Sequence, residues 1–317
     1  MRVAITGGTG FVGRHLARLL VSQGHEAVLV SRGVDRRDES VRSSAGMEFK
    51  PVGIGDVDAL PGAFEGCEAV AHLGGINREI GSQTYEHVHV KGTANVIEAA
   101  RRAGARKIIF LSFLRARPNC KLAYHESKHA AELLVQKSGL DYTVFKAGVI
   151  YGAGDHMLDH ISHALHTFPV FLLVGFRSLP VRPLAVEDLV DVMSSSLTEG
   201  RLSNKTVPIT GPEQMDLREA VARISRVAGK KRLTFSVPVW VHSAMSWFFE
   251  RTMAVPLAAK AQVRILSESL VEPLLAQDRL PSDLEPQTPF TDEQIRKGLP
   301  EPGGFTVRDC LCRAQTQ

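Results

Sequence analysis

The stretch of sequence that decides the fold is Met1-Arg-Val-Ala-Ile-Thr-Gly-Gly-Thr-Gly-Phe-Val-Gly13. A short apolar run at residues 3–5 leads directly into glycines at positions 7, 10 and 13, and leucines then recur at helical spacing. This order predicts a strand, a tight turn and a helix. Glycine accepts positive φ and lets the backbone lie against a pyrophosphate, while the helix N-terminus directs its free N–H groups at the phosphates. The stretch therefore predicts a dinucleotide-binding turn, and a tight turn without a ligand is the alternative.

Beyond this turn, apolar segments alternate with helical runs up to residue 150, which is the pattern of a parallel sheet covered by helices. We expect an α/β fold, a doubly wound parallel sheet (Rossmann fold) with strand order 3-2-1-4-5-6 and a smaller C-terminal substrate lobe. The expected domains are residues 1–150, which bind the dinucleotide, and residues 151–317, which form the cap. Residues around 178–210 are expected to return to the first domain.

The composition is that of an ordinary globular protein, with 44% hydrophobic and 23% charged residues in 317. The net charge of +4, from 38 basic and 34 acidic residues, is too small and too mixed to indicate a nucleic-acid partner. Four cysteines are too few for a disulfide framework in a chain of this length. Without a recognisable signal peptide or 18 consecutive apolar residues, we expect a cytoplasmic protein, with a peripheral place at the inner face of a membrane as the alternative.

The end of the second predicted strand indicates which dinucleotide binds. NAD is usually met by an acidic residue about 20 residues beyond the glycines, and Ser31 and Arg32 stand in that place instead. A guanidinium beside a hydroxyl suits the 2′-phosphate of NADP, because arginine donates paired, charge-assisted hydrogen bonds. Arg36 and Arg37 could add to the same field. We expect NADP as the cofactor, with NAD, or a solvated basic loop without a ligand, as the alternatives.

Four further motifs lie at the places where the strands end and the helices begin. They are Gly55-Asp56-Val57, His72-Leu73-Gly74-Gly75, His89-Val-Lys-Gly-Thr93 and Tyr124-His-Glu-Ser-Lys128. Together with the glycine spacing they resemble the short-chain dehydrogenase/reductase superfamily, in its extended and atypical branches. The resemblance implies that Asp56 contacts the adenine, although it could instead cap a helix. We expect His72 to serve structure, because a histidine inside a strand is more often a core residue than a ligand. The implied cofactor site comprises Thr6, Gly7, Gly10, Phe11, Val12, Gly13, Ser31, Arg32, Asp56, Val57, Leu73, Gly74 and Lys128.

In this superfamily a tyrosine exchanges a proton with the substrate while hydride moves to or from the nicotinamide. A lysine four residues later lowers the pKa of the tyrosine and holds the ribose. The resemblance implies that Tyr124 and Lys128 form this pair and that Ser112 is the third catalytic residue. Active relatives place a serine or threonine about two residues beyond Ser112, where this sequence has Leu114, so Ser112 takes that role only if the loop register differs.

The position where Arg-Pro is usual in the sixth strand is occupied by Lys146-Ala147. A retained scaffold with altered catalytic positions is similar to the atypical branch that contains the nucleotide-binding accessory subunit of respiratory complex I. The resemblance implies either an NADP(H)-dependent oxidoreductase or epimerase, or a non-catalytic NADP(H)-binding accessory or assembly protein of a membrane-linked complex. We favour the enzyme, because an accessory protein does not need a tyrosine at position 124. Residues 152–180, which are expected to line the substrate cleft, match no pattern that would identify the small-molecule substrate.

Two features of the second half bear on ligands and partners. Histidines 156, 160 and 163 share one helical face, but no glutamate or cysteine completes a recognisable set, so we expect no metal. Residues 239–275 contain an aromatic segment and a helical apolar stripe. This segment packs as a core helix of the cap or provides a peripheral contact with a membrane or a protein complex.

Overall fold

The computed structural model describes residues 1–33, 39–230, 232–238, 240–242, 244, 271–275 and 277–304. The chain divides into two compact units. The first contains Met1–Gly148, Val186–Thr210 and Glu272–Gln287, and the second contains Val149–Ala185, Gly211–Val271 and Thr288–Gln317. Three separate segments of chain therefore build each unit. Arg36 and Arg37, as well as most of the segment 239–275, lie outside the described residues.

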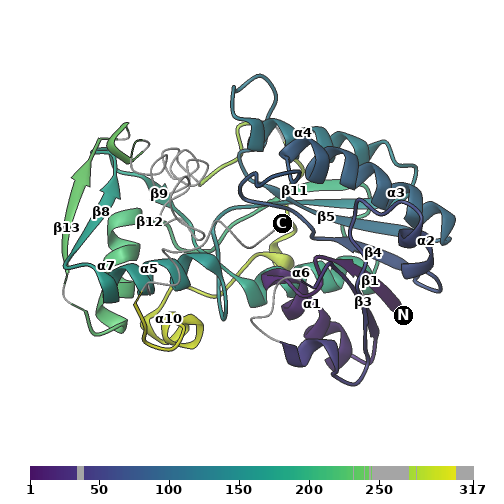
Figure 1. The fold of residues 1–317 in the computed structure, drawn as a ribbon, viewed down its shortest axis with the longest axis horizontal. Helices are drawn as coiled ribbons and strands as arrows, with labels where there is room; N and C mark the ends of the chain where they lie inside the picture. Colours follow the sequence, from purple (N-terminus) through teal and green to yellow (C-terminus); the bar gives the residue numbers. More distant parts are fainter. Residues whose placement is uncertain are drawn as a thin grey trace. The chain divides into compact units, whose positions relative to one another are not determined.

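The first unit is built on a seven-stranded parallel sheet with the order β11-β6-β5-β4-β1-β2-β3 (Figure 1). The predicted order of the first six strands is confirmed, and β11 pairs in parallel with β6 as a seventh strand. Because β1 pairs with both β2 and β4, the order of the strands reverses beside β1. Ligands of such sheets bind at this reversal, beyond the carboxyl ends of the strands. The strands are β1 (Arg2–Thr6), β2 (Glu26–Val30), β3 (Met47–Lys50), β4 (Ala69–His72), β5 (Lys107–Phe113), β6 (Asp141–Ala147) and β11 (Lys205–Ile209).

Helices cover both faces of this sheet (Figure 1). On one face α3 packs against α2 and α4, and on the other α1 packs against α6. The unit also contains two 3-10 turns, η1 and η3, and a π-helical turn, η2. These elements are α1 (Phe11–Ser22), η1 (Glu39–Arg42), α2 (Ala59–Ala63), η2 (Glu86–Lys91), α3 (Gly92–Arg102), α4 (Ala123–Gln136), α6 (Val186–Thr198) and η3 (Ser282–Leu284).

Helices α1 and α4, which carry candidate site residues, have a buried apolar stripe or a glycine after their last turn. In α1 the buried stripe includes Leu16 and Leu20, which are fully shielded from solvent. Glycines with positive φ, Gly24 (φ +82°) and Gly139 (φ +74°), follow α1 and α4 closely, as is common at helix C-termini. The first unit thus has a strand–turn–helix at its start, and a second helix, α4, packs beside β5 and β6.

Among its described residues, the second unit contains short strands and three helices. Three two-stranded pairs form, β10 with β7 and β13 with β8 in parallel, and β12 with β9 antiparallel. Helix α7 packs against α5 and α10. Thr291 caps α10, since its hydroxyl accepts a hydrogen bond from the Gln294 N–H at 3.3 Å. The elements are β7 (Ile150–Tyr151), α5 (His156–Thr167), β8 (Val170–Val174), β9 (Pro180–Val181), β10 (Leu184–Ala185), β12 (Met215–Asp216), α7 (Leu217–Val227), β13 (Leu233–Val237) and α10 (Asp292–Gly298).

A search of the described helices finds none whose length and apolar character would let it span a bilayer.

Candidate active site

The glycine turn between β1 and α1 has room for backbone only. Gly7 adopts φ +68°, and a Cβ on it would lie 3.0 Å from the Cα of Gly74. A Cβ on Gly13 would lie 2.3 Å from the Gly7 carbonyl oxygen. Gly10 is the N-cap of α1 and has no side chain to occupy the N–H groups of the first turn, which begins with Phe11. The turn therefore has the close packing and the open helix N-terminus that a pyrophosphate requires.

The loop after β2 carries the residues predicted to choose between the dinucleotides. The Ser31 hydroxyl bonds to that of Thr9 at 2.8 Å and accepts the Gly33 N–H at 3.2 Å, so it joins this loop to the glycine turn. Arg32 is exposed, and its stem runs close to Gly53, where a Cβ would lie 3.2 Å from the Arg32 Cγ. Within the described part of the chain, no hydrogen bond or ion pair engages its guanidinium, which leaves it available to an anion.

Arg42 brings a second guanidinium to the same loop, which the sequence did not indicate. Its side chain donates to the Gly33 carbonyl at 2.8 Å and lies 4.9 Å from the centre of the Phe49 ring. No local sequence signal links Arg42 to Gly33, because the contact arises only when η1 folds back on the end of β2. A second arginine, Arg42, therefore lies near Arg32, and it was not identified from the sequence.

Asp56 and Val57, predicted to contact the adenine, follow β3 and are exposed. One carboxylate oxygen of Asp56 accepts the Ala59 N–H at 3.1 Å, which is the capping alternative raised from the sequence. The other carboxylate oxygen makes no hydrogen bond with the described residues. Asp56 can thus hold the start of α2 and still offer an acceptor to a ligand.

The loop after β4 meets the glycine turn. The Leu73 N–H donates to the Thr6 carbonyl at 3.2 Å and the Gly74 N–H donates to the Thr6 hydroxyl at 3.3 Å. A Cβ on the next residue, Gly75, would lie 3.3 Å from the Lys128 Nζ. The structure therefore brings the predicted residues of the first turn, the β4 loop and Lys128 into one neighbourhood.

Tyr124 stands in the first turn of α4 and is partly exposed. Its ring is surrounded by aromatic neighbours with centroids 5.5–5.9 Å away, those of Tyr85, His89, Phe113 and His125. Burial raises the pKa of the Tyr124 hydroxyl, and the nearby Tyr85 adds to the effect. Its hydroxyl forms no hydrogen bond with the residues that the structure describes, so it is available to a substrate or cofactor group.

Lys128, one helical turn further along α4, is buried and donates to the Leu111 carbonyl at 3.1 Å. Its Nζ lies 5.1 Å from the centre of the Phe110 ring. Burial lowers the pKa of Lys128 to about 8, while the carboxylate of Glu132 opposes this shift. A lysine with a pKa lowered into this range is typical of functional sites, where burial and neighbouring charges shift titratable groups.

Ser112, predicted as the third catalytic residue, ends up in a different set of contacts. Its hydroxyl donates to the carboxylate of Glu132, and only 5% of the residue is exposed. Both carboxylate oxygens of Glu132 also accept hydrogen bonds from Lys146 Nζ, at 2.7 and 2.9 Å. Leu114 is fully buried, so the position where relatives carry an oxygen-orienting hydroxyl belongs to the core. The structure brings together Tyr124 and Lys128 but holds Ser112 in a buried ionic cluster.

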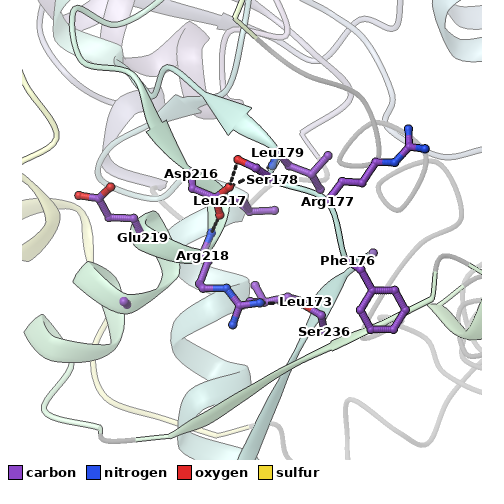
Figure 2. Close-up of a pocket in the computed structure, with 12 residues that line it drawn as sticks. Leu173, Phe176, Arg177, Ser178, Leu179, Asp216, Leu217, Arg218, Glu219 and Ser236 are labelled. Carbon is purple, nitrogen blue, oxygen red and sulfur yellow. Dashed lines mark hydrogen bonds between the residues drawn. The ribbon is translucent and has the colours of Figure 1, made fainter.

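The second unit has an open pocket of about 440 Å³ between the end of β8 and the start of α7 (Figure 2). Asp216 caps α7 and accepts hydrogen bonds from Ser178, Leu179 and Arg218 (Figure 2). Arg218 also donates to the Ser236 hydroxyl at 2.7 Å. None of the residues predicted from the sequence as catalytic or cofactor-binding lines this pocket.

The histidine face of α5 does not gather metal ligands. His163 and His166 each bond through Nδ1 to a carbonyl oxygen one turn earlier, at 2.7 and 2.8 Å. Across the described residues, no group of three His, Cys, Asp or Glu side chains could hold a metal ion. The buried Asp155 at the start of α5 accepts the N–H groups of Gly152 and Leu158, and burial raises its pKa to about 7.

Comparison with known proteins places this geometry in a family. Residues 7–158 match the sequence profile of a family described as NAD(P)H-binding. The chain is 30% identical over 156 residues to an uncharacterized sugar epimerase, YhfK, of Bacillus subtilis, covering 47% of this chain and 72% of that protein. It is 26% identical over 253 residues to the photosystem II assembly factor Ycf39 of Synechocystis, covering 78% and 74% of the two chains.

The comparison also supports the predicted resemblance to an accessory subunit of respiratory complex I. The 40 kDa subunit of NADH-ubiquinone oxidoreductase from Neurospora crassa is 20% identical over 275 residues, covering 85% of this chain and 72% of that one. Relatives from Mycobacterium tuberculosis are 27% identical over 226 residues, but the chain spans only 23% of their length.

Among solved structures, the fold matches UDP-glucose 4-epimerase of Thermus thermophilus in complex with NAD. The TM-score is 0.69 at 20% identity, covering 94% of this chain and 97% of that one. The glycine turn, the strand order and these relatives agree with one another. The chain belongs to the NAD(P)-binding short-chain dehydrogenase/reductase superfamily, in its extended, epimerase-like branch.

Proposed function

We propose that this protein is an NADP(H)-dependent oxidoreductase or epimerase in which Tyr124 and Lys128 carry the proton transfer. The observation that supports it most is the neighbourhood of Lys128, whose Nζ lies between the Leu111 carbonyl and the loop at Gly75. That loop is tied to the glycine turn through Thr6. A lysine in this place is close to both the predicted cofactor loops and the tyrosine one helical turn before it.

The residues present fit a dinucleotide. A Cβ on Gly7 would meet the backbone of Gly74, and a Cβ on Gly13 would meet the Gly7 carbonyl oxygen. Glycine at both positions therefore keeps the turn tight, so that its backbone can lie against a pyrophosphate. The first turn of α1 would hold the phosphates by its N–H groups. Bound NADP(H) would supply or accept the hydride. Lys128 would hold the ribose and lower the pKa of Tyr124 by its charge, and Tyr124 would give a proton to, or take one from, the substrate oxygen.

NADP is preferred over NAD in this proposal because of Arg32. Its guanidinium is exposed and unengaged by the described residues, and Arg42 lies next to the same loop. Titration with both dinucleotides tests the preference. Replacing Arg32 with Ala should weaken NADPH by about tenfold or more, since hydrogen bonds to a charged group contribute about 1.5–3 kcal/mol. NADH should bind the variant as it binds the native chain, and equal binding of the two dinucleotides by the native chain would refute the assignment.

Activity is tested on a panel of aldehydes, ketones and nucleotide sugars, followed by NADPH absorbance and by epimer analysis. Turnover that Tyr124→Phe abolishes, with NADPH binding retained, would support the enzyme. Nucleotide sugars enter the panel because the Thermus thermophilus structure is of a UDP-glucose 4-epimerase.

Two observations favour a second function, a non-catalytic accessory or assembly role. Ser112 is held by Glu132, and Leu114 is buried where active relatives have a hydroxyl. Ycf39 is an assembly factor, which shows that a relative can serve assembly. In this case NADPH would raise the melting temperature without any turnover on the panel. The contact surface would be residues 239–275 at a protein complex or the inner face of a membrane; of its described residues, Trp240 is 72% exposed.

A further inference from the structure

Two buried hydrogen-bonded chains cross the first unit beside the proposed site. In one, the Ile76 N–H donates to His89 Nε2 at 3.2 Å. That nitrogen must therefore carry no proton, so His89 Nδ1 carries it and donates to the Ser127 hydroxyl at 2.9 Å. The Ser127 hydroxyl in turn donates to the Tyr124 carbonyl at 3.0 Å. The loop after β4 is thus connected to the first turn of α4.

The other chain has the same logic. The Gly74 N–H donates to the Thr6 hydroxyl at 3.3 Å, and that hydroxyl donates to His72 Nδ1 at 2.7 Å. His72 Nε2 then carries the proton and donates to the Thr93 hydroxyl at 2.9 Å. Thr93 donates to the carbonyl of His89, the residue that anchors the first chain. His89 stands in the π-helical turn η2, an irregularity that often occurs at functional sites.

Both imidazoles are held neutral. Burial lowers the pKa of His72 to about 3 and that of His89 to about 2, and the positive charge of Lys128 contributes to both shifts. A second proton on His89 would lie on Nε2, where it would face the Ile76 N–H. Two donors would then point at each other, which disfavours the charged imidazole. Each chain starts at a peptide N–H and ends at a peptide carbonyl, neither of which releases or accepts a proton at ordinary pH. The chains therefore cannot conduct protons.

We name the two chains together the histidine strut; its side chains are those of Thr6, His72, Thr93, His89 and Ser127. All five are buried. We propose that the strut fixes loop 74–76 against turn 124–128, so that it positions the cofactor loop and the Tyr124–Lys128 pair relative to each other. That the strut positions a cofactor loop and a catalytic pair rests on the proposed function. The hydrogen-bonded connection between loop 74–76 and turn 124–128 does not depend on it.

Hydrogen–deuterium exchange of the full chain without cofactor tests the link. Ser127→Ala removes the last hydroxyl of the strut, and the Ile76 amide, which is two steps away, should then exchange two- to twelve-fold faster. This range corresponds to the loss of one hydrogen bond, about 0.5–1.5 kcal/mol. Ser127→Thr keeps a hydroxyl and should restore the native rate. Ser22→Ala is the matched control, because Ser22 also donates to the carbonyl three residues earlier, Leu19, at 2.7 Å, but is exposed.

NADPH titration extends the test to function. Ser127→Ala should weaken NADPH by a similar factor, while Ser127→Thr and Ser22→Ala should not. The affinities of the native chain and Ser127→Ala should run parallel between about pH 6 and 9, because no strut histidine titrates there. An unchanged Ile76 exchange rate in Ser127→Ala, or pH curves that diverge through the histidine range, would overturn the proposal. If the native chain fails to bind NADPH at all, the proposed function fails, while the exchange rates still decide on the strut.

Discussion

Replacing Lys146 with Met is expected to destabilise the first unit strongly. Lys146 is fully buried, and its three ammonium protons are taken by the two oxygens of Glu132, at 2.7 and 2.9 Å, and by the Ala116 carbonyl at 3.0 Å. Burial lowers the pKa of Lys146, while Glu132 opposes the shift. Methionine would fill most of the space but would leave the Glu132 carboxylate, itself 3% exposed, without its cation.

The magnitude follows from this uncompensated charge. Breaking a buried ion pair by removing one partner costs about 3–5 kcal/mol of unfolding free energy. Urea denaturation followed by circular dichroism measures the loss, with the transition of the first unit fitted separately if the two units unfold in sequence. The double variant Lys146→Met, Glu132→Gln should recover a large part, because it removes the charge that the single change strands.

An exposed ion pair provides the control. Arg102 and Glu98 lie one turn apart on α3 at 2.9 Å and are mostly in solvent, so Arg102→Ala should cost at most about 0.5 kcal/mol. A loss below about 1 kcal/mol for Lys146→Met would contradict the buried, charged pair. So would a double variant that is less stable than the single one.

Three further outcomes are expected. Gly13→Ala should weaken NADPH by at least about tenfold, because its Cβ would lie 2.3 Å from the Gly7 carbonyl; Gly62→Ala, with nothing within 4 Å, is the control. Asp155 has its pKa raised to about 7, so its contribution to stability is complete below about pH 4 and is lost as pH rises to 7. The free energy of unfolding should then change by up to about 1.4 kcal/mol per pH unit between about pH 4 and 7. Asp155→Asn should remove this pH dependence, which thermal melts across that range would measure. If Lys128 titrates near pH 8, carbonyl reduction should fall above that pH, and Lys128→Arg should move the fall to higher pH; an unmoved pH profile would argue against Lys128.

The fold was predictable because its signals are local. The glycines of the first turn, and Gly24 and Gly139 after the helices, are required by backbone geometry that no other residue satisfies as easily. The parallel strands alternate with helices at a spacing that permits one right-handed arrangement. The seventh strand, β11, was foreseen as a returning segment, but its pairing with β6 depends on α6, whose packing on α1 no local pattern announces.

The site was predictable only where a motif is contiguous. Tyr124 and Lys128 are four residues apart on one helix, so their meeting follows from helical geometry. The contact between His89 and Ser127 joins residues 38 positions apart, and no local pattern of the sequence links them. The catalytic role of Ser112 was implied by the family resemblance, and its bond to Glu132 depends on the register between β5 and α4, which the sequence does not state.

The central claim is that Tyr124 transfers the proton while the glycine turn holds NADP(H). Its most direct test is a single-turnover measurement of deuteride transfer from deuterated NADPH to the best substrate of the panel, with native protein and Tyr124→Phe. The account predicts that Tyr124→Phe lowers the transfer rate by about 10²–10⁴-fold while the dissociation constant of NADPH stays within about twofold. Transfer at the native rate in Tyr124→Phe would contradict the account.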